Sequence, residues 1–442
     1  MIAQRMSRIL EPRFYLPGEK LYIAAVIYLL AAVPLDAYTR ITGTTGSVEE
    51  GNLLQQLIWM GAYGIAMLPL AALMRNTLWL WKKNILLVTL VIMACFSAFW
   101  SADPYTTLRR SVACLGTFML GSYMAVRFTP AEMVRLVAAG LGLAALSSFV
   151  LAGFMPQQAI VESGVHEGRW RGVYTHKNEL GRYMVLGLMT SIMAYSLSSG
   201  LLQRAYLAGA VLCAGLLLLS QSATALVAAI MTGLVWFMVN RIRRSAHAGR
   251  HMAVALAVAI VTSSILMAAF FLMENQLLLS LLGRSSDLTQ RVPLWNGAMA
   301  GISDHPWLGF GYEVFWDRSR GLAYSYISGF LNWDAPHAHN GILQLGTNLG
   351  LIGIGIFLYH FVQVSGRTVR LLGHTTEPPA DFALIILIIT VLINMMEVTI
   401  MRDNNLLWLA YIYVALRSSY SMELQAEGRH AASITMTMTK PV

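Results

Sequence analysis

The stretch Pro336-His337-Ala338-His339-Asn340 is followed at once by 341–362, an apolar run long enough to cross a membrane. Imidazole accepts or releases a proton near neutral pH, so two histidines beside a membrane helix suggest chemistry at a membrane surface. Asn340 is a favourable N-cap, and the helix dipole at that end favours neutral, basic imidazole. Alone, the pair is equally compatible with two polar residues at a loop–helix junction.

The composition indicates an integral membrane protein. Hydrophobic residues make up 57% of the 442 residues and charged residues only 12%, about half of the fraction in soluble domains. Cys95, Cys114 and Cys213 lie in apolar stretches and have no metal-site or disulfide spacing. We predict an all-α polytopic membrane protein with about twelve transmembrane helices. The apolar runs are Leu21–Leu35, Leu53–Met74, Ile85–Trp100, Val112–Val126, Met133–Met155, Leu180–Leu197, Leu201–Leu219, Ala223–Val239, Met252–Met273, Gly341–Val362, Phe382–Ile400 and Leu406–Leu416.

The basic residues predict the orientation of the bundle. Most of the 31 lysines and arginines fall in cytoplasmic segments if the N-terminus is cytoplasmic, and Arg241–Arg250 is the firmest anchor. An even number of helices then returns the C-terminus to the cytoplasm. Residues 1–442 are predicted to form a single membrane domain with a cytoplasmic tail at 418–442. The net charge of +9 is therefore assigned to topology and not to nucleic-acid binding.

Three segments carry basic residues against this topological bias. They are predicted to lie on the outer face, where an anionic ligand would explain them. Pairing with lipid phosphates or with local acidic residues is the alternative. The residues are Arg109 and Arg110; Arg169, Arg171, Lys177 and Arg182; and Arg284, Arg291, Arg318 and Arg320.

Residues 274–340 form the only long polar segment and are predicted to be an outer loop subdomain. An amphipathic helix over 288–303 should lie against the bundle. Asp304-His305-Pro306 should end this helix, and Gly309-Phe310-Gly311 should form a tight turn. The apolar residues at helical spacing are Val292, Trp295, Met299 and Ile302.

Four segments in order resemble the O-antigen ligase/polymerase superfamily. They are RWRGVYTHKNELG at 169–181, RVPLW at 291–295, HPWLGFGYEVF at 305–315 and HAHN at 337–340. Each motif alone is weak, and their order on one face of a helical bundle carries the resemblance. Length and layout are most similar to the lipopolysaccharide O-antigen ligases, whereas the motifs fit ligases and polymerases equally.

The resemblance implies a GT-C-like glycosyltransferase at the periplasmic face of the bacterial inner membrane, acting with inversion at the anomeric carbon. The donor would be a glycan, the O-antigen, on undecaprenyl pyrophosphate, and the acceptor a sugar hydroxyl of lipid A–core. A polymerase of the same superfamily is the alternative, and a flippase or exporter for lipid-linked glycan is the competing class. Transporters usually carry ionisable residues near the bilayer midplane, whereas here they gather on one face, which favours an enzyme.

The residue chemistry assigns roles within this reaction. His339 matches the family histidine and is the predicted general base, with His337 orienting the acceptor and Asp334 able to hold either ring. Guanidinium groups bind phosphate at two points and stay charged. Predicted pyrophosphate contacts are Arg171, Lys177 and Arg291, then Arg169, Arg182 and Arg284; Asn178 and Asn340 are expected to cap helices or to hydrogen-bond sugars.

We expect a reaction without metal or other cofactor. The outer loops lack an Asp-x-Asp pair, and their acidic residues are scattered. Abundant arginine can neutralise a leaving pyrophosphate in place of a divalent cation. The scattered acids are Asp287, Asp304, Glu313, Asp317 and Asp334.

Overall fold

The computed structural model describes residues 18–31, 53–164, 166–243, 291–317, 321–328, 335–373 and 378–438, which form helices and loops with an isolated bridge between Ile160 and Trp170. Within the described residues, helices cover most of each predicted apolar run; Met252–Met273 and the end of Leu21–Leu35 lie outside the described residues. The helices are α2 (Glu19–Leu30), α4 (Leu53–Ala72), α5 (Met74–Lys83), α6 (Ile85–Phe96), η1 (Ser97–Phe99), α7 (Pro104–Arg127), α8 (Pro130–Phe154), α9 (Pro156–Ala159), α10 (Lys177–Ser196), α11 (Gly200–Ser220), α12 (Ala223–Arg243), α15 (Arg291–Asp304), α16 (Leu322–Ile327), α17 (Gly341–Leu372), α18 (Pro378–Asn394) and α19 (Leu406–Met438).

The helices are those of an integral membrane protein. Within the described ranges, α4, α8, α11, α12 and α17 are each long and apolar enough to cross a membrane. A sixth crossing is possible if α5 and α6–η1, which are bent by 96°, act as one span. The predicted number of about twelve stays a prediction. Helix α5 is not expected from the sequence, where its basic residues Lys82 and Lys83 suggest a cytoplasmic loop; these residues occupy its last turn.

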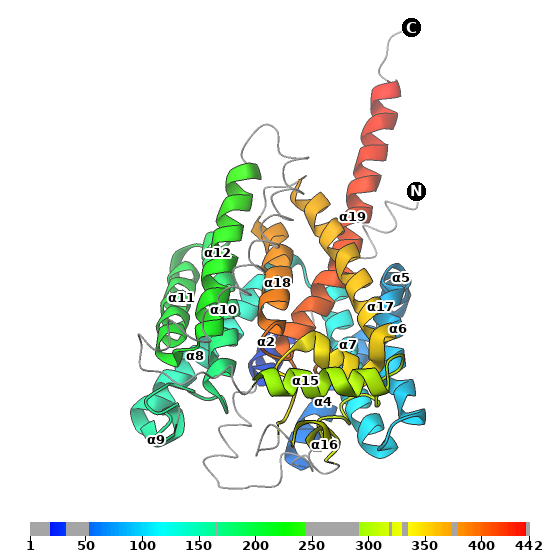
Figure 1. Cartoon of the computed structure of the whole chain (residues 1–442). Helices are drawn as coiled ribbons and strands as arrows, with labels where there is room; N and C mark the ends of the chain where they lie inside the picture. Colours follow the sequence, from blue (N-terminus) through cyan, green and yellow to red (C-terminus); the bar gives the residue numbers. More distant parts are fainter. Residues whose placement is uncertain are drawn as a thin grey trace.

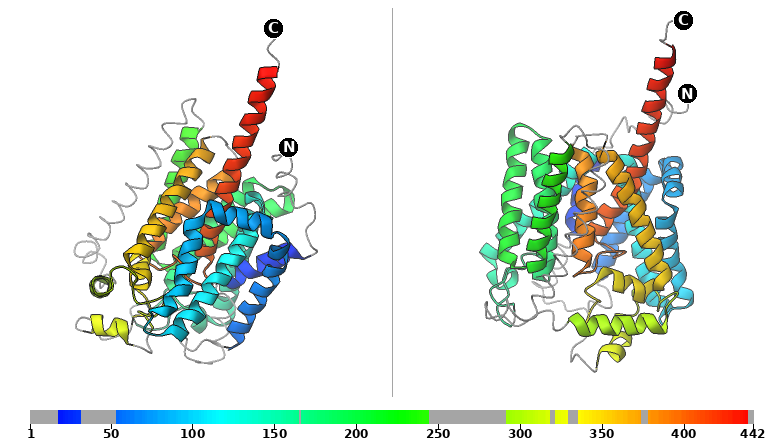
Figure 2. Two further views of the ribbon diagram at one scale, coloured as in Figure 1. Left: turned by 90° about the vertical axis from the view of Figure 1, so that its right-hand side faces the viewer. Right: turned by 45° about the horizontal axis from the view of Figure 1, so that its top comes forward.

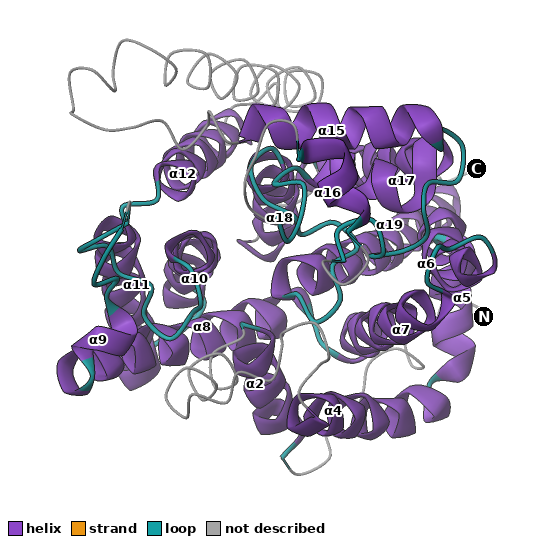
Figure 3. Ribbon diagram, turned by 60° about the horizontal axis from the view of Figure 1, so that its bottom comes forward, coloured by secondary structure: helices purple, strands orange, loops and turns teal. Residues whose placement is uncertain are grey.

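The bundle has two ends of different character. We call the end that carries α9, α15 and α16 the loop end, and the opposite one, where α7 and α12 finish at Arg127 and Arg243, the far end (Figure 1). Helix α19 extends past its neighbours at the far end (Figure 2), so the predicted tail at 418–442 begins inside a continuous helix. Seen from the loop end, α15 lies across the bundle (Figure 3), and it contacts α16 and α17.

Helix α17 is broken at Gly350, and the break holds the loop 306–311. Gly350 has φ 66° and ψ −168°, a conformation open to glycine, and a side chain there would meet the backbone of Trp307. The break frees backbone groups that need partners in an apolar surrounding. Phe310 N–H donates to Thr347 O (2.9 Å), and Leu351 N–H donates to Pro306 O (2.7 Å).

Helix α15 ends at Asp304, as the sequence predicts, and only part of the predicted apolar stripe contacts the rest of the protein. Trp295 packs on the loop core and Ile302 lies against Gly346 of α17, whereas Val292 and Met299 are 46% and 49% exposed. The buried face consists of small residues and one leucine, because α16 and the loop between α15 and α16 approach it closely. A Cβ on Gly297 would meet Ile327 of α16, and one on Gly301 would meet Phe315 of that loop. The buried residues are Leu294, Gly297, Ala298 and Gly301.

Candidate active site

The histidine pair sits on a tight loop at the start of α17. Asn340 caps this helix, as predicted: its Oδ1 accepts from Ile342 N (3.0 Å) and Leu343 N (3.1 Å). The backbone N–H of His339 donates to His337 Nδ1 at 3.2 Å, and the two ring centroids are 4.1 Å apart. The cap and this turn together hold both imidazoles at the loop end of the bundle.

Glu397 lies beside His339, on the turn that follows α18. Asn394 Oδ1 accepts from Thr399 N (2.8 Å) and Ile400 N (3.1 Å), which folds this turn back on the helix end. Gly341 allows the start of α17 to approach, since a Cβ there would overlap Asn394. His339 Nδ1 is consequently 3.9 Å from Glu397 Oε1, although the two residues are far apart in the sequence.

The first turns of α10 bring a guanidinium and an amide to the same carboxylate. Asn178 Nδ2 donates to Glu397 Oε1 (3.0 Å), and its Oδ1 accepts from Ser222 Oγ (2.9 Å). Arg182 lies between Glu179 (2.8 Å) and Glu397 (3.8 Å). The capping role expected for Asn178 is wrong: His176 caps α10, with its Nδ1 accepting from Asn178 N–H.

Arg291 begins α15 and points to the same group. Its Nη1 donates to Met396 Sδ at 3.0 Å, and a thioether is only a weak acceptor. The charge of Arg291 acts on His337, His339 and Glu397. This guanidinium therefore keeps most of its capacity to bind an anion.

Two other predicted phosphate contacts, Arg171 and Arg169, bind the loop before α10. Arg171 donates to the backbone carbonyls of Gln158 (3.0 Å) and Gln157 (3.2 Å), and Arg169 contacts His166 Nδ1 at 2.9 Å. These two side chains hold the loop before α10 together. Lys177 is buried at the start of α10. Arg284 and Asp334 lie outside the described residues.

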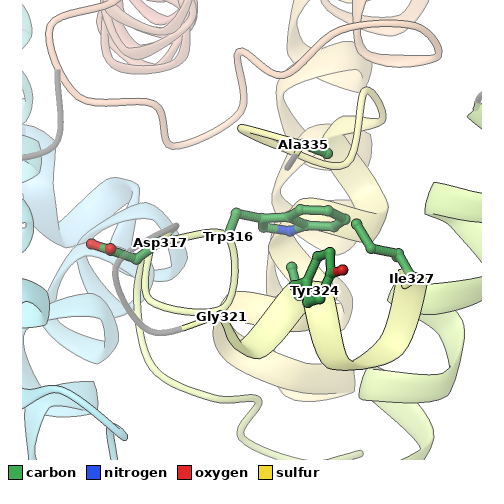
Figure 4. A pocket seen from close by; sticks show the side chains of 7 residues that line it. Trp316, Asp317, Gly321, Tyr324, Ile327 and Ala335 are labelled. Carbon is green, nitrogen blue, oxygen red and sulfur yellow. The ribbon is translucent and has the colours of Figure 1, made fainter. Parts of the chain in front are cut away.

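A second charged group adjoins the histidine loop. Buried Glu313 forms an ion pair with Arg402, which is isolated in the sequence from the other basic residues. Arg110 at the start of α7 lies 3.9 Å from Asp317, and both Arg110 and Arg291 belong to helices that begin at the loop end. A shallow hollow opens next to Asp317, between Trp316 and Tyr324 (Figure 4).

The electrostatics favour neutral imidazoles and a charged carboxylate. Burial lowers the pKa of His339 below 6.5, and burial together with nearby cationic groups lowers the pKa of His337 further. Burial opposes the charge on Glu397, but His339 when it is protonated, together with Arg182 and Arg291, outweighs this and lowers the pKa of the carboxyl. A neutral imidazole next to an ionised carboxylate is suited to accept a proton.

His337, His339 and Glu397 could also hold a metal ion, since each offers a ligand atom within 4.8 Å of the others. Two imidazoles and a carboxylate resemble the donor set of zinc sites. The surroundings oppose a cation, because the charges of Arg402, Arg182 and Arg291 all act against positive charge on His337. A divalent ion would have to bind against three guanidinium groups.

Sequence reasoning missed four residues that the fold brings to this site. They come from segments distant in the sequence, so no local motif joins them. The sequence does contain one indication: Glu397 and Arg402 are isolated ionisable residues between two strongly apolar runs. Ionisable residues in such positions carry a high free-energy cost and are usually functional. The missed residues are His176, Glu313, Glu397 and Arg402.

Comparisons with known proteins agree with the motifs. A family described as O-antigen ligase matches residues 208–358, which include Arg291 and both histidines of the pair. The exopolysaccharide production protein ExoQ of Rhizobium meliloti (strain 1021) is 26% identical over 333 residues, which cover 73% of this chain and 74% of that protein. The similarity therefore extends well beyond the histidine loop.

Proposed function

We propose that this chain, which belongs to the O-antigen ligase superfamily, transfers a glycan from undecaprenyl pyrophosphate to a sugar hydroxyl without a metal ion. The observation that carries the proposal is the convergence of His339, Glu397 and two arginines, Arg182 and Arg291, at the loop end. A neutral base, a carboxylate that orients it and guanidinium groups for the leaving phosphate are what this displacement requires.

In the proposed reaction, His339 takes the proton of the acceptor hydroxyl as its oxygen attacks the anomeric carbon of the donor. The new glycosidic C–O bond forms while the bond from that carbon to the pyrophosphate oxygen breaks, with inversion. Glu397 on the Nδ1 side favours the tautomer that leaves the other ring nitrogen basic. Undecaprenyl pyrophosphate departs with both electrons of the broken bond, and His339 later releases its proton to water.

The proposed pyrophosphate site differs from the one expected from sequence. Arg291 is its first member, because the atom to which it donates is a weakly accepting sulfur. Arg182 is the second, since it lies at the same carboxylate as His339. Arg171 and Arg169 are proposed to stabilise the loop before α10 and not to bind the pyrophosphate, because their guanidinium groups contact this loop.

Two acceptors are proposed for this site. Lipid A–core is the first, on the resemblance in length and layout to O-antigen ligases. A growing exopolysaccharide is the second, because ExoQ is an exopolysaccharide production protein and covers most of the chain. The chemistry at His339 is the same in both, and the acceptor alone distinguishes a ligase from a polymerase.

The proposed setting is the bacterial inner membrane, with the loop end in the periplasm, both termini in the cytoplasm and a GT-C-like arrangement. Arg127, Arg243 and Lys82 at the far end support this orientation. A cysteine at exposed Tyr324 should react with an impermeant thiol reagent in intact spheroplasts, and one at exposed Leu78 should react only after lysis. The reverse pattern would overturn the orientation.

The direct test combines purified protein and lipid-linked glycan with rough lipopolysaccharide or with free glycan, and reads the product on a gel. We expect a product with one acceptor, insensitive to EDTA. Chelator-sensitive transfer restored by magnesium or zinc would replace the arginine mechanism with a metal site at His337, His339 and Glu397. Movement of the glycan across vesicles without any product would identify a flippase.

A further inference from the structure

The peptide between the two histidines is held on both sides. The backbone N–H of Ala338 donates to Gln344 Oε1 on the first turn of α17 at 3.0 Å. The carbonyl of the same residue accepts from Trp295 Nε1 on α15 at 3.1 Å. Ala338 itself is fully buried. Two elements far apart in the sequence thus fix one peptide whose neighbours are His337 and His339.

The orientation of Gln344 is itself determined by a buried charge. Its Nε2 donates to Glu313 Oε1 at 3.2 Å, and Glu313 is also ion-paired with Arg402. A carboxylate only accepts hydrogen bonds, so the amide nitrogen of Gln344 must face it and the amide oxygen must face Ala338. The polar chain runs from Arg402 through Glu313 and Gln344 to the backbone of the histidine loop.

This loop needs such support, because it is held in an unfavourable conformation. His339 has φ 49°, in the left-handed region that residues other than glycine uncommonly adopt, although histidine does so more often than most. Glu313 has φ 59° and lies in the same region. Such uncommon backbone conformations persist only where several surrounding contacts hold them, and they are concentrated at functional sites.

We propose that Gln344 and Glu313 are positioning residues that hold the histidine loop in its reactive conformation, with Trp295 supporting the other side of the same peptide. This inference rests on the proposed function, in which His339 is the base. Gln344 and Glu313 act through Ala338 and do not touch the substrate. A displacement of the base by about 1 Å can cost a hundredfold in rate, which sets the size of the expected effect.

Asn348 provides a matched control for Gln344. It lies one turn further along α17, and its Nδ2 also donates to Glu313 Oε1, at 3.1 Å, but within the described residues it forms no hydrogen bond with the histidine loop. Gln344→Ala and Asn348→Ala therefore each remove one amide contact to the same buried carboxylate. Only the first also frees the Ala338 N–H. The comparison separates loss of positioning from a general weakening around Glu313.

The test measures kcat and donor KM for both variants, with the folded fraction taken from size-exclusion chromatography. Gln344→Ala should lower kcat about a hundredfold per folded molecule with donor KM unchanged, whereas Asn348→Ala should stay within about threefold of the parent. Equal kcat values for the two variants would overturn the proposal. His339→Ala, assayed in parallel, tests the base itself. If His339→Ala is active, the proposed function is refuted. If His339→Ala is inactive and Gln344→Ala is fully active, only the positioning role is refuted.

A charge exchange gives a second test that does not depend on the alanine variants folding. Gln344→Glu places two carboxylates face to face, and Glu313→Gln leaves Arg402 without its carboxylate, so each variant should lower kcat. The double variant restores one carboxylate and one amide, and the carboxylate then at position 344 can still accept from Ala338 N–H. Recovery of at least about tenfold in kcat over Gln344→Glu supports the chain of contacts, and additive losses contradict it.

Discussion

Buried arginines occur at both ends of the helix bundle, but their partners differ. At the far end, Arg243 is ion-paired with Asp381, which also accepts from Trp236 Nε1 at 2.8 Å. Arg127 binds Glu19 through two nitrogens, at 2.6 and 2.8 Å. These bonds are bidentate or supported by a third side chain. They join α7 to α2 and α12 to α18, as structural ion pairs in a membrane protein are expected to do.

At the loop end, Glu397 has a guanidinium and an imidazole as neighbours, and a further arginine lies next to them without a carboxylate contact among the described residues. Arg182 and the imidazole of His339 both lie within 4 Å of Glu397, and Arg291 next to them donates to a sulfur atom. Arg182 also pairs with Glu179 at 2.8 Å, whereas the sulfur atom that Arg291 contacts is only a weak acceptor. The difference between the ends indicates that Arg291 at the loop end can bind an additional anion. Substitutions at either end of the bundle test this difference.

The largest expected effect is at His339. His339→Ala should reduce transfer about a hundred- to ten-thousand-fold while the protein stays inserted and binds donor, because a general base is lost and little packing changes. His337→Ala should cost less, since its proposed work is to orient the acceptor. Equal mild losses in a transfer assay would exclude both imidazoles as the base.

The next effect concerns stability at the far end. Asp381→Ala leaves Arg243 buried without its carboxylate and should lower the free energy of unfolding by about 3–5 kcal/mol. Thermal unfolding of the purified protein measures this loss. Transfer per folded molecule should remain at the parent level. A loss of transfer at unchanged stability would mean that the two ends are not functionally distinct.

A smaller effect is expected at Arg291. Arg291→Ala removes one charged phosphate contact, worth about 1.5–3 kcal/mol, and should raise donor KM roughly tenfold to a hundredfold. Arg291→Lys should recover only part, because lysine lacks the planar fork. Full activity of the lysine variant, with the alanine variant merely unstable, would assign Arg291 to structure.

The smallest effect is in the pH profile. Because burial lowers the pKa of His339, its basic form persists below the ordinary imidazole value of 6.5. As the pH falls, kcat/KM should therefore decline only below 6.5, when His339 becomes protonated and can no longer accept a proton. A titration of kcat/KM from mildly acidic to mildly basic pH measures this; a midpoint at or above 6.5 would mean that another group titrates.

The fold was predictable where local pattern decides it. Apolar runs gave the positions of the helices, and the N-cap at Asn340 and the end of α15 at Asp304 follow from single residues with strong positional preferences. Helix α5 was missed because its pattern, with Leu78 and basic residues in one short helix, is that of an interfacial segment and resembles a polar loop.

The site was only partly predictable. Arg171 and Arg182 lie only eleven residues apart in the sequence, but α10 begins between them. Arg171 therefore binds the backbone of the preceding loop, whereas Arg182 reaches Glu397. No spacing rule joins Glu397 to His339 or Glu313 to Gln344, because these contacts depend on how distant helices and loops meet. The sequence pattern predicts His339 and Arg291 as reactive residues, and the fold adds the residues that contact them.

The most direct test of the account is the thermal shift produced by the lipid-linked donor. A ligand that binds the folded state raises its unfolding temperature, and does so more when its affinity is higher. Undecaprenyl-pyrophosphate glycan should therefore stabilise the parent protein, His339→Ala and Asp381→Ala by similar amounts, and Arg291→Ala far less. Equal stabilisation of Arg291→Ala, or none of His339→Ala, would contradict the claim that the loop end binds the pyrophosphate separately from its base.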